Sequence, residues 1–533
     1  MGQRSQGGPE PRRGEAWSHG AALVAAVGAA FGAALWNGFL WDDEVLILGN
    51  PLIRSFKNAG VILKTALWLG NGNYYRPLPG LTFLVDHALW GLDGAWGFHL
   101  TNLVLHASFA VLLYLLLKRR FSGRASFWAS LLYAVHPVHA AAVVPVYARD
   151  NVLSATWLVA LLALEASVRR PRAGWLALGG FAVSLLAKES ALAFPAIAWA
   201  FARCHLNAEG RRSTRWVLAG LWCVAAAYLA ARLKWMPLGA AAPLSMIADQ
   251  PLPVRGWTFL RSFLEYLGLA LLPLTLRTER HFAAAFSDWR AWLGLARLAG
   301  ALRHAWRRRQ ERPYLLFGWV WFLAPLGPVS NLVPLALTMA EQWLYVPMMG
   351  LAWILAGLLD SRWPPPRPGT PAAAAPWLTP ALACASLLLA ARSGARALEW
   401  RDGPTLYRSD ARRSPDSFVL QNNLGVELLR AGDRDGAERQ FRRALALDER
   451  YNVARNNLGA MLEGRGDLRG ALEAYRSAAL ADYELAYGNL ARLLARLGRP
   501  QEAEAVLEQG ARRHPFNAEL PSLLGELRAQ RRR

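Results

Sequence analysis

Three consecutive acids, Asp42, Asp43 and Glu44, directly follow the first long apolar run of the chain. Carboxylates at such a boundary can be solvated loop residues. One of them could also act as a general base, because an apolar environment raises the pKa of a carboxyl group towards neutrality. Clustered carboxylates are also the ligands that divalent cations favour. The residues alone leave these three roles open.

Lys188 and Glu189 lie between two short apolar segments. They could form a simple loop ion pair. Alternatively, Lys188 faces a phosphate at the membrane surface and Glu189 orients it. Arg76 and Arg149 could bind the same anion. In the second interpretation these residues bind the head group of a lipid-linked monophosphate or diphosphate donor.

Four histidines lie in apolar stretches. His136 and His139 flank Pro137 and Val138, a spacing that puts both imidazoles on one face of a helix. Two imidazoles without a third ligand are weak grounds for a metal site, so a bend at Pro137 with hydrogen-bonded histidines is preferred. The other two are candidates for lining a cavity or bonding between helices, namely His99 and His106.

Several enzyme classes lack their sequence signatures. There is no P-loop, GxSxG or HExxH motif. The three cysteines form neither a CxxC pattern nor a disulfide framework. Hydrolase, ATPase and zinc-enzyme interpretations therefore have no support.

The composition indicates a membrane part joined to a soluble part. Of 533 residues, 54% are hydrophobic and 18% are charged. The formal net charge of +22 does not indicate a nucleic-acid partner, because short basic runs separate apolar segments as the positive-inside rule predicts. The runs are 118–120, 169–170, 211–212 and 307–309.

Apolar runs of about 20 residues predict membrane-spanning helices. The stronger candidates are 21–40, 98–117, 127–146, 152–168, 216–233, 314–333 and 343–359. Shorter or weaker ones are 175–186, 192–201, 289–302 and 372–391. The stretch 257–276 contains Glu265 and is interpreted as re-entrant or interfacial.

The expected topology has about eleven spans. Residues 1–20 form a cytoplasmic tail, and residues 21–40 form an uncleaved first span. With this orientation the basic runs and the Pro-rich linker 361–371 are cytoplasmic, whereas the loops 41–97 and 234–255 are external. The C-terminal region then lies outside the cytoplasm.

From about Ser414 the sequence repeats with a period of 34 residues, as in a tetratricopeptide (TPR) array. Asn-Leu-Gly at 423–425 recurs at 457–459, and Ala437, Phe441 and Ala444 recur at 471, 475 and 478. A third unit contains Asn-Leu-Ala at 489–491, Ala503 and Pro515, and Gly525 is expected to open a terminal helix. Residues 402–413 form a preceding half-repeat. The predicted fold class is all-α: a membrane bundle over 21–392 and a TPR solenoid over 393–533.

The chain resembles the transmembrane and TPR-containing proteins related to protein O-mannosyltransferases, in the GT-C glycosyltransferase superfamily. The resemblance runs from about Trp36 to the C-terminus. Its marks, in order, are Phe-Leu-Trp-Asp-Asp-Glu at 39–44, Tyr-Arg-Pro-Leu at 75–78, 81–83, 98–106, the His-Pro-Val-His element within 134–139, 186–189, 328–331 and 340–347.

The resemblance implies a GT-C bundle whose active site lies on the external face. It implies transfer of a sugar, typically mannose, from a polyprenyl-phosphate donor to a protein hydroxyl. An acid of the first loop would be the base; we expect Asp43, with Asp42 and Glu44 beside it. Glu341 joins the four histidines as a cavity-lining candidate. No cofactor is expected besides this donor. If the three acids do not supply a base, they could instead bind a divalent cation.

Three positions depart from the family pattern. After the His-Pro-Val-His element the family pattern has Thr-Glu, whereas this chain has Ala140-Ala141. The family's Arg-x-Asp motif appears here as Arg149-Asp150-Asn151, with the acid one position earlier. The family's Glu-Arg is Glu341-Gln342 in this chain. These changes favour an alternative, a non-catalytic membrane-anchored TPR scaffold. A third alternative is transfer to a lipid or cell-wall polymer. In each case the TPRs would bind a protein or peptide.

The Ala-, Arg- and Gly-rich composition is typical of a high-GC bacterial genome. We therefore expect the inner membrane as the location, with the TPRs in the periplasm.

Overall fold

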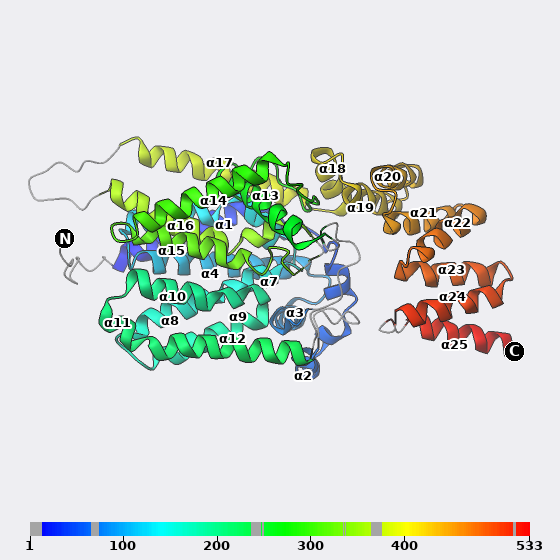
Figure 1. Ribbon diagram of the computed structural model, residues 1–533, viewed down its shortest axis with the longest axis horizontal. Coiled ribbons are helices and arrows are strands. Elements are labelled where there is room, and N and C mark those ends of the chain that lie inside the picture. The colour runs from blue at the N-terminus through cyan, green and yellow to red at the C-terminus, as the bar shows by residue number, and fades with distance from the viewer. Residues whose placement is uncertain are drawn as a thin grey trace, which may run out of the picture. The chain divides into compact units, whose positions relative to one another are not determined.

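The computed structural model describes residues 13–65, 74–235, 247, 250–333, 335, 337–363, 376–514, 517 and 519–532. The chain divides into two compact units, Met1–Arg401 and Asp402–Arg533. Both are helical (Figure 1), and β pairing within the described residues is limited to the isolated bridge between Arg280 and Met339. The predicted all-α class is confirmed.

Some predicted features lie outside the described residues. They are most of the tail 1–20, the linker 361–371 beyond residue 363, most of the loop 234–255, and Pro515.

The first unit is built from long helices joined by short helical turns. The long helices are α1 (Arg13–Phe31), α3 (Pro77–Trp90), α4 (Ala95–Leu117), α5 (Gly123–Ala134), α8 (Trp157–Ser167), α9 (Ala173–Ala187), α10 (Phe194–His205), α12 (Arg215–Trp235), α13 (Leu252–Leu271), α14 (Trp289–Arg307), α15 (Pro313–Leu323), α16 (Pro347–Arg362) and α17 (Leu378–Glu399). The short α-helices are α2 (Ala59–Ile62), α6 (Ala140–Val143), α7 (Arg149–Leu153) and α11 (Ala208–Ser213).

Four described helical stretches are long and apolar enough to cross a membrane: Glu15–Trp36, Ala95–Leu117, Arg215–Lys234 and Leu378–Glu399. Two further apolar helices, Ala173–Ala187 and Pro313–Leu326, are shorter. Length and composition therefore support four spans, and the total of about eleven stays a prediction. Helix α13 is continuous and carries the pair Arg261–Glu265 at 3.5 Å, so the proposal that it does not cross stays open as well.

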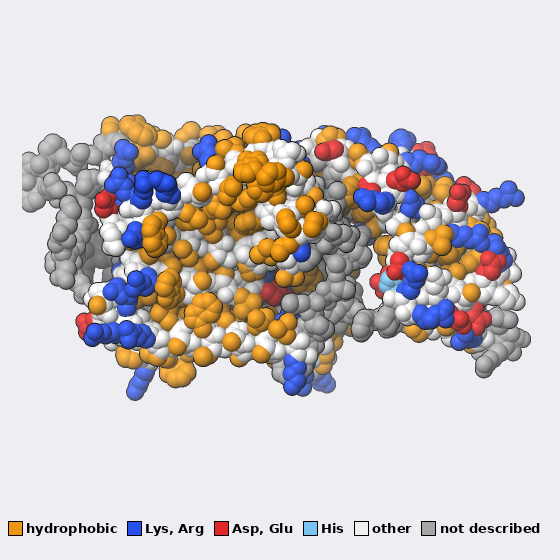
Figure 2. Space-filling model, in the orientation of Figure 1, with side chains coloured by type: hydrophobic (Ala, Val, Ile, Leu, Met, Phe, Trp, Pro, Cys, Tyr) orange, Lys and Arg blue, Asp and Glu red, His pale blue; other side chains and the backbone are white. Residues whose placement is uncertain are grey.

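The outer surface of this unit is strongly apolar. Hydrophobic side chains cover much of the face shown in Figure 2. Trp175, Leu176, Leu387 and Leu388 are each about two-thirds exposed or more. A soluble protein rarely exposes apolar side chains on this scale, whereas lipid tails cover them without cost. Together with the apolar helices, this surface identifies an integral membrane protein.

Two predicted spans are interrupted and a third, 314–333, is helical only as far as Leu326, which corrects the simple helical interpretation of the sequence. The segment 127–146 is helical only to Ala134; a 3₁₀ turn over Pro137–His139 and the short helix α6 follow. Proline cannot donate a backbone hydrogen bond, and its ring clashes with the preceding turn. The segment 152–168 is broken by a 3₁₀ turn over Ser154–Thr156. The breaks leave irregular backbone in the interior of the unit, where polar side chains gather.

The second unit consists of helix pairs. The single helix α18 (Gly403–Arg413) precedes α19 (Phe418–Arg430) with α20 (Arg434–Leu447), α21 (Asn452–Gly464) with α22 (Leu468–Leu480), and α23 (Glu484–Arg496) with α24 (Pro500–Arg513). Asp433 and Asp467, 34 residues apart, cap α20 and α22 through the N–H groups of Gly436 and Gly470. The spacing follows the sequence repeat.

The terminal helix α25 spans Glu519–Arg532, so the prediction that Gly525 opens it is wrong. Asn517 opens this helix instead. Its side-chain oxygen accepts the backbone N–H groups of Glu519 at 2.8 Å and Leu520 at 3.0 Å. An Asn cap satisfies donors that the first helical turn leaves unpaired, whereas Gly525 lies well within the helix.

Candidate active site

Of the three acids at the start of the first loop, Asp43 is the one that is fully buried. One carboxylate oxygen accepts the backbone N–H of Tyr147 at 2.6 Å, and the other accepts that of Leu40 at 3.1 Å. Burial raises the pKa of Asp43 to about 7 despite these hydrogen bonds. Asp43 therefore ties the start of the first loop to the irregular segment after α6.

Asp42 is half-buried and differs from its neighbour. Burial raises its pKa to about 7, and the negative charges of Glu279 and Asp150 add to this effect. Within the described residues no hydrogen bond reaches the Asp42 carboxylate. Glu44 opens a π-helical turn, Glu44–Leu48. The three acids thus occupy three different environments.

Arg76, Lys188 and Glu189 come together as the sequence analysis expected, around Asp150. The Arg76 guanidinium lies 2.6 Å from Asp150 and 2.7 Å from Glu189. The Lys188 ammonium lies 3.2 Å from Asp150 and also donates to the side-chain oxygen of Asn151. Burial lowers the pKa of Lys188, although the adjacent Asp150 opposes this effect.

Arg149 is directed elsewhere. It is fully buried, and its guanidinium lies 2.6 Å from Asp86 of α3. It also donates to the side chain of Asn102 at 2.6 Å and to the backbone oxygen of Phe98 at 2.8 Å, both on α4. Arg149 therefore links α7 to α3 and α4, and these contacts engage it away from Lys188.

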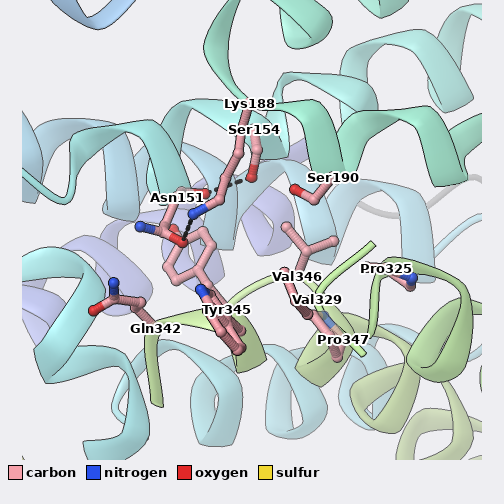
Figure 3. Close-up of a pocket in the computed structure, with 11 residues that line it drawn as sticks. Asn151, Ser154, Lys188, Ser190, Pro325, Val329, Gln342, Tyr345, Val346 and Pro347 are labelled. Atoms are coloured by element: carbon pink, nitrogen blue, oxygen red, sulfur yellow. Dashed lines mark hydrogen bonds between the residues drawn. The ribbon is translucent and has the colours of Figure 1, made fainter. Parts of the chain in front are cut away.

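A small cavity opens beside Lys188 (Figure 3). Short turns and irregular backbone supply most of its lining: Asn151, Ser154, Lys188, Ser190, Pro325, Val329, Gln342, Trp343, Tyr345, Val346 and Pro347. Among these lining residues Lys188 alone is charged, and amide and hydroxyl groups surround it. The Lys188 ammonium is itself paired with Asp150, which is not among the lining residues.

His99, His106 and His136 hydrogen-bond to their neighbours, and no histidine is among the residues that line this cavity. His99 contacts the backbone oxygen of Val144 at 2.8 Å, and His136 contacts that of Ala270 at 3.2 Å. His106 lies between the Tyr345 hydroxyl at 2.8 Å and the backbone oxygen of Ala134 at 2.9 Å. His106 thereby holds Tyr345, which does line the cavity.

His136 and His139 lie at a 3₁₀ turn, which corrects the expectation that they share a helical face; their ring centroids are 5.9 Å apart. Glu341 is buried beside Arg280 at 2.9 Å and accepts the backbone N–H of Arg277 at 2.7 Å. In the described part of the chain, no group of three or more His, Cys, Asp or Glu side chains is placed to hold a metal ion.

Sequence reasoning missed three of these partners. Asp86 pairs with Arg149, Glu279 adds its charge near Asp42, and Arg280 pairs with Glu341. Asp86 could have been suspected, since it is an acid in an otherwise apolar helix. Glu279 and Arg280 follow an apolar stretch and carry no comparable signal.

Comparisons with known proteins agree with both units. Residues 87–235 match the family model described as dolichyl-phosphate-mannose-protein mannosyltransferase, and residues 420–450 and 485–514 match a tetratricopeptide-repeat model. The protein O-mannosyl-transferase Tmtc3 of Drosophila melanogaster is 27% identical over 508 aligned residues, which cover 77% of this chain and 53% of the relative.

Two mammalian relatives are similar over different extents. The protein O-mannosyl-transferase TMTC4 of Mus musculus is 26% identical, covering 76% of this chain and 63% of the relative. TMTC3 of Homo sapiens is 31% identical over 144 residues, which cover 26% of this chain and 16% of the relative. The chain thus spans about half the length of the fly relative. These matches confirm the resemblance to TPR-containing proteins related to protein O-mannosyltransferases.

Proposed function

We propose that this protein is a membrane glycosyltransferase that moves a sugar, mannose, from a polyprenyl-phosphate donor to a hydroxyl group of a protein. One observation carries the proposal. The segment 147–151 contacts both the acidic loop and the Lys188 cavity, through the Tyr147 N–H to Asp43 and through Asp150 and Asn151 to Lys188. The residue next to the proposed proton acceptor Asp42 and the proposed phosphate-binding cation Lys188 are thereby attached to one short stretch of chain.

In this proposal Asp42 is the general base. Asp43 was the expected base, but both of its oxygens accept backbone hydrogen bonds, so its role is to hold the loop. The Asp42 carboxylate takes the proton of the acceptor hydroxyl as that oxygen attacks the anomeric carbon. The bond from this carbon to the phosphate oxygen breaks, and the lipid phosphate leaves with the electron pair. A single displacement inverts the anomeric centre.

Lys188 binds the donor phosphate, and Asn151, Ser154 and Ser190 offer hydrogen bonds beside it. Arg76 holds Asp150 and Glu189 in place around the lysine. Arg149 has a structural role, since its contacts with Asp86, Asn102 and Phe98 keep it buried.

The proposed membrane arrangement follows from the basic loops. We place the N-terminus in the cytoplasm and about eleven spans in a bacterial inner membrane, with α13 not crossing. The acidic loop and the TPR unit then lie on the periplasmic side, where the TPRs recruit the protein acceptor.

The test uses purified full-length protein in lipid, radiolabelled polyprenyl-phosphate mannose and a membrane extract as acceptor. Wild type is compared with Asp42→Asn, Asp43→Asn and Asp93→Asn. Asp93 is an exposed acid of the same loop and serves as the matched control. We expect label in protein with wild type and the control, and loss of transfer with Asp42→Asn.

Transfer by Asp42→Asn at the wild-type rate would move the base to Asp43 or Glu44. If wild type transfers no label from this donor or from a panel of others, the scaffold function takes precedence. The specific observation in favour of a scaffold is Gln342, a neutral residue of the cavity at the position where the family pattern implied by the resemblance has arginine.

A further inference from the structure

Arginines gather at the end of α14 and in the turn that follows it. Within residues 303–312 the chain has one acid, Glu311, and five arginines, namely Arg303, Arg307, Arg308, Arg309 and Arg312. These five arginines are here called the arginine cluster. So much charge of one sign in so short a stretch repels itself unless something outside it supplies negative charge.

The protein itself neutralises little of this charge. Glu311 pairs with Arg308 at 2.6 Å, and the guanidinium of Arg309 lies 4.2 Å from the centre of the Trp306 ring. The remaining three are exposed and have no ion pair within the described residues: Arg303, Arg307 and Arg312. The cluster therefore presents three unneutralised guanidinium groups at the surface.

The basic turn after α4 shows the opposite arrangement. Arg119 and Arg120 lie 3.4 and 2.5 Å from the carboxylate of Glu165, and Arg120 also donates to the backbone oxygen of His205. There the arginines join the end of α4 to α8 and α10. A basic turn of this protein can thus serve an internal contact, whereas the arginine cluster leaves its charge for an external group.

The surroundings of the cluster point to the surface of a membrane. Trp306 lies beside Arg307 in the last turn of α14, and 58% of its surface is exposed. Tryptophan is enriched at the depth of the lipid head groups, because its ring is apolar and its N–H is polar. The opposite side of α14 packs against α13 and α15. Guanidinium groups next to an exposed tryptophan would lie at the depth of lipid phosphates, which they bind with paired hydrogen bonds.

We propose that the arginine cluster binds the head groups of anionic phospholipids, with Arg303, Arg307 and Arg312 contacting phosphate and Trp306 anchoring the helix end beside them. Charge sets the selectivity. A zwitterionic head group carries its own cation next to the phosphate, so it gains less from three arginines than an anionic head group does. In the proposed membrane arrangement this end of α14 faces the cytoplasm.

The test measures stabilisation by lipid. Full-length protein in a neutral detergent is titrated with phosphatidylglycerol, which is anionic, or with phosphatidylcholine of the same acyl chains, and the midpoint of thermal unfolding is recorded. A ligand that binds the native state raises this midpoint as its concentration rises. We expect a larger rise with phosphatidylglycerol than with phosphatidylcholine, and a smaller difference at high salt, because ions screen the attraction.

The triple variant Arg303→Gln, Arg307→Gln and Arg312→Gln should need about tenfold or more phosphatidylglycerol for the same rise, as the loss of three cationic contacts predicts. The matched control removes three exposed arginines from the second unit and so has the same net charge: Arg412→Gln, Arg439→Gln and Arg469→Gln. It should respond to lipid as wild type does. Each variant is compared with itself in phosphatidylcholine, so a change in its basal stability does not enter.

Equal rises with the two lipids in wild type, or equal losses of the response in the triple variant and the control, would overturn the proposal. Inorganic phosphate and glycerol 3-phosphate are tested in the same way. If either raises the midpoint as much as phosphatidylglycerol does, the site binds free phosphate and the lipid assignment is wrong. If no phosphate compound has an effect, the lipid assignment is also wrong, and an acidic protein partner becomes the candidate for the cluster.

The assay requires neither a sugar donor nor transfer. Its result is therefore independent of whether the protein is a transferase or a scaffold.

Discussion

The guanidinium of Arg149 lies 2.6 Å from the carboxylate of Asp86, and both side chains are almost completely buried. A buried charge that loses its partner is strongly destabilising, whereas replacing both partners with apolar groups costs much less. This pair joins α7, next to the candidate active site, to α3. Its integrity therefore bears on the position of the whole site.

Arg149→Met is expected to lower the free energy of unfolding by about 3–5 kcal/mol, because it leaves Asp86 unpaired. The double variant Arg149→Met with Asp86→Leu should recover most of this loss. Thermal unfolding of the detergent-solubilised protein measures both. A single variant no less stable than the double variant would contradict the pairing.

Sugar transfer is expected to rise with pH through about 7. Burial, with Glu279 and Asp150 nearby, raises the pKa of Asp42 to about 7, and the base must be deprotonated to accept a proton. Glu279→Gln removes a negative neighbour, which lowers this pKa and moves the ascending limb to lower pH. The pH profile of label transfer tests this, with the exposed Glu311→Gln as control. An unshifted limb in Glu279→Gln would argue against Asp42 as the base.

Asp43→Ala should loosen the first loop. The substitution removes both acceptors of the Tyr147 and Leu40 amides, and each buried hydrogen bond to a charged group contributes about 1.5–3 kcal/mol. Hydrogen exchange at these two amides should accelerate by at least about tenfold. Asp42→Ala, one residue earlier, should leave them protected. Unchanged exchange in Asp43→Ala would show that other contacts hold the loop.

Lys188→Met should impair use of the donor. Lys188 is the charged residue of the cavity, and a hydrogen bond from an ammonium group to phosphate contributes about 1.5–3 kcal/mol, which corresponds to about 10–100-fold in kcat/KM. The dependence of transfer on donor concentration gives this value. Lys118→Met, in the basic turn after α4, is the matched control and should transfer normally. Normal kcat/KM in Lys188→Met would place the phosphate elsewhere.

The TPR pairs show matched side-chain sizes. A Cβ atom on Gly425 would lie 2.7 Å from the Phe441 ring, and one on Gly459 would lie 2.8 Å from the Tyr475 ring. In the third repeat Ala491 takes the place of the glycine and Leu507 packs in the same core. Where the partner side chain is smaller than an aromatic ring, a methyl group is accommodated.

Leu507→Phe alone should therefore overpack this core and cost about 1–3 kcal/mol, and adding Ala491→Gly should recover part of that cost. The comparison uses thermal unfolding followed by circular dichroism. If Ala491→Gly lowered the stability further instead of restoring it, the two side chains would not be matched in size.

The repeat spacing and the polar residues of the site could be predicted from the sequence, but their pairing could not. The 34-residue period placed Phe441 and Tyr475 correctly because each repeat packs against its neighbour in the same way. Lys188, Glu189 and Arg76 were expected to lie together, and the structure brings them together around Asp150; that they bind an anion stays a prediction. Arg149 looked equivalent in sequence, yet Asp86 and Asn102 hold it elsewhere. Which acid an arginine meets depends on packing between helices distant in the chain.

The acids of the first loop show a second reason why the site could not be fully predicted from the sequence. Sequence places Asp42 and Asp43 in equal positions after the first apolar run. Only the fold decides that Asp43 receives two backbone N–H groups while Asp42 receives none in the described structure. Likewise, Pro137 predicted a bend, but whether a bend or a complete break follows depends on the neighbours that satisfy the freed backbone groups.

The stretch from Tyr147 to Asp150 sets the distance between the acidic loop and Lys188. The Tyr147 N–H binds Asp43 of the acidic loop and Asp150 binds the ammonium of Lys188, so three peptide units separate the two attachment points. One inserted residue would add up to about 3.3–3.6 Å, more than a hydrogen bond tolerates. The register of these few residues therefore sets how far the acidic loop lies from Lys188.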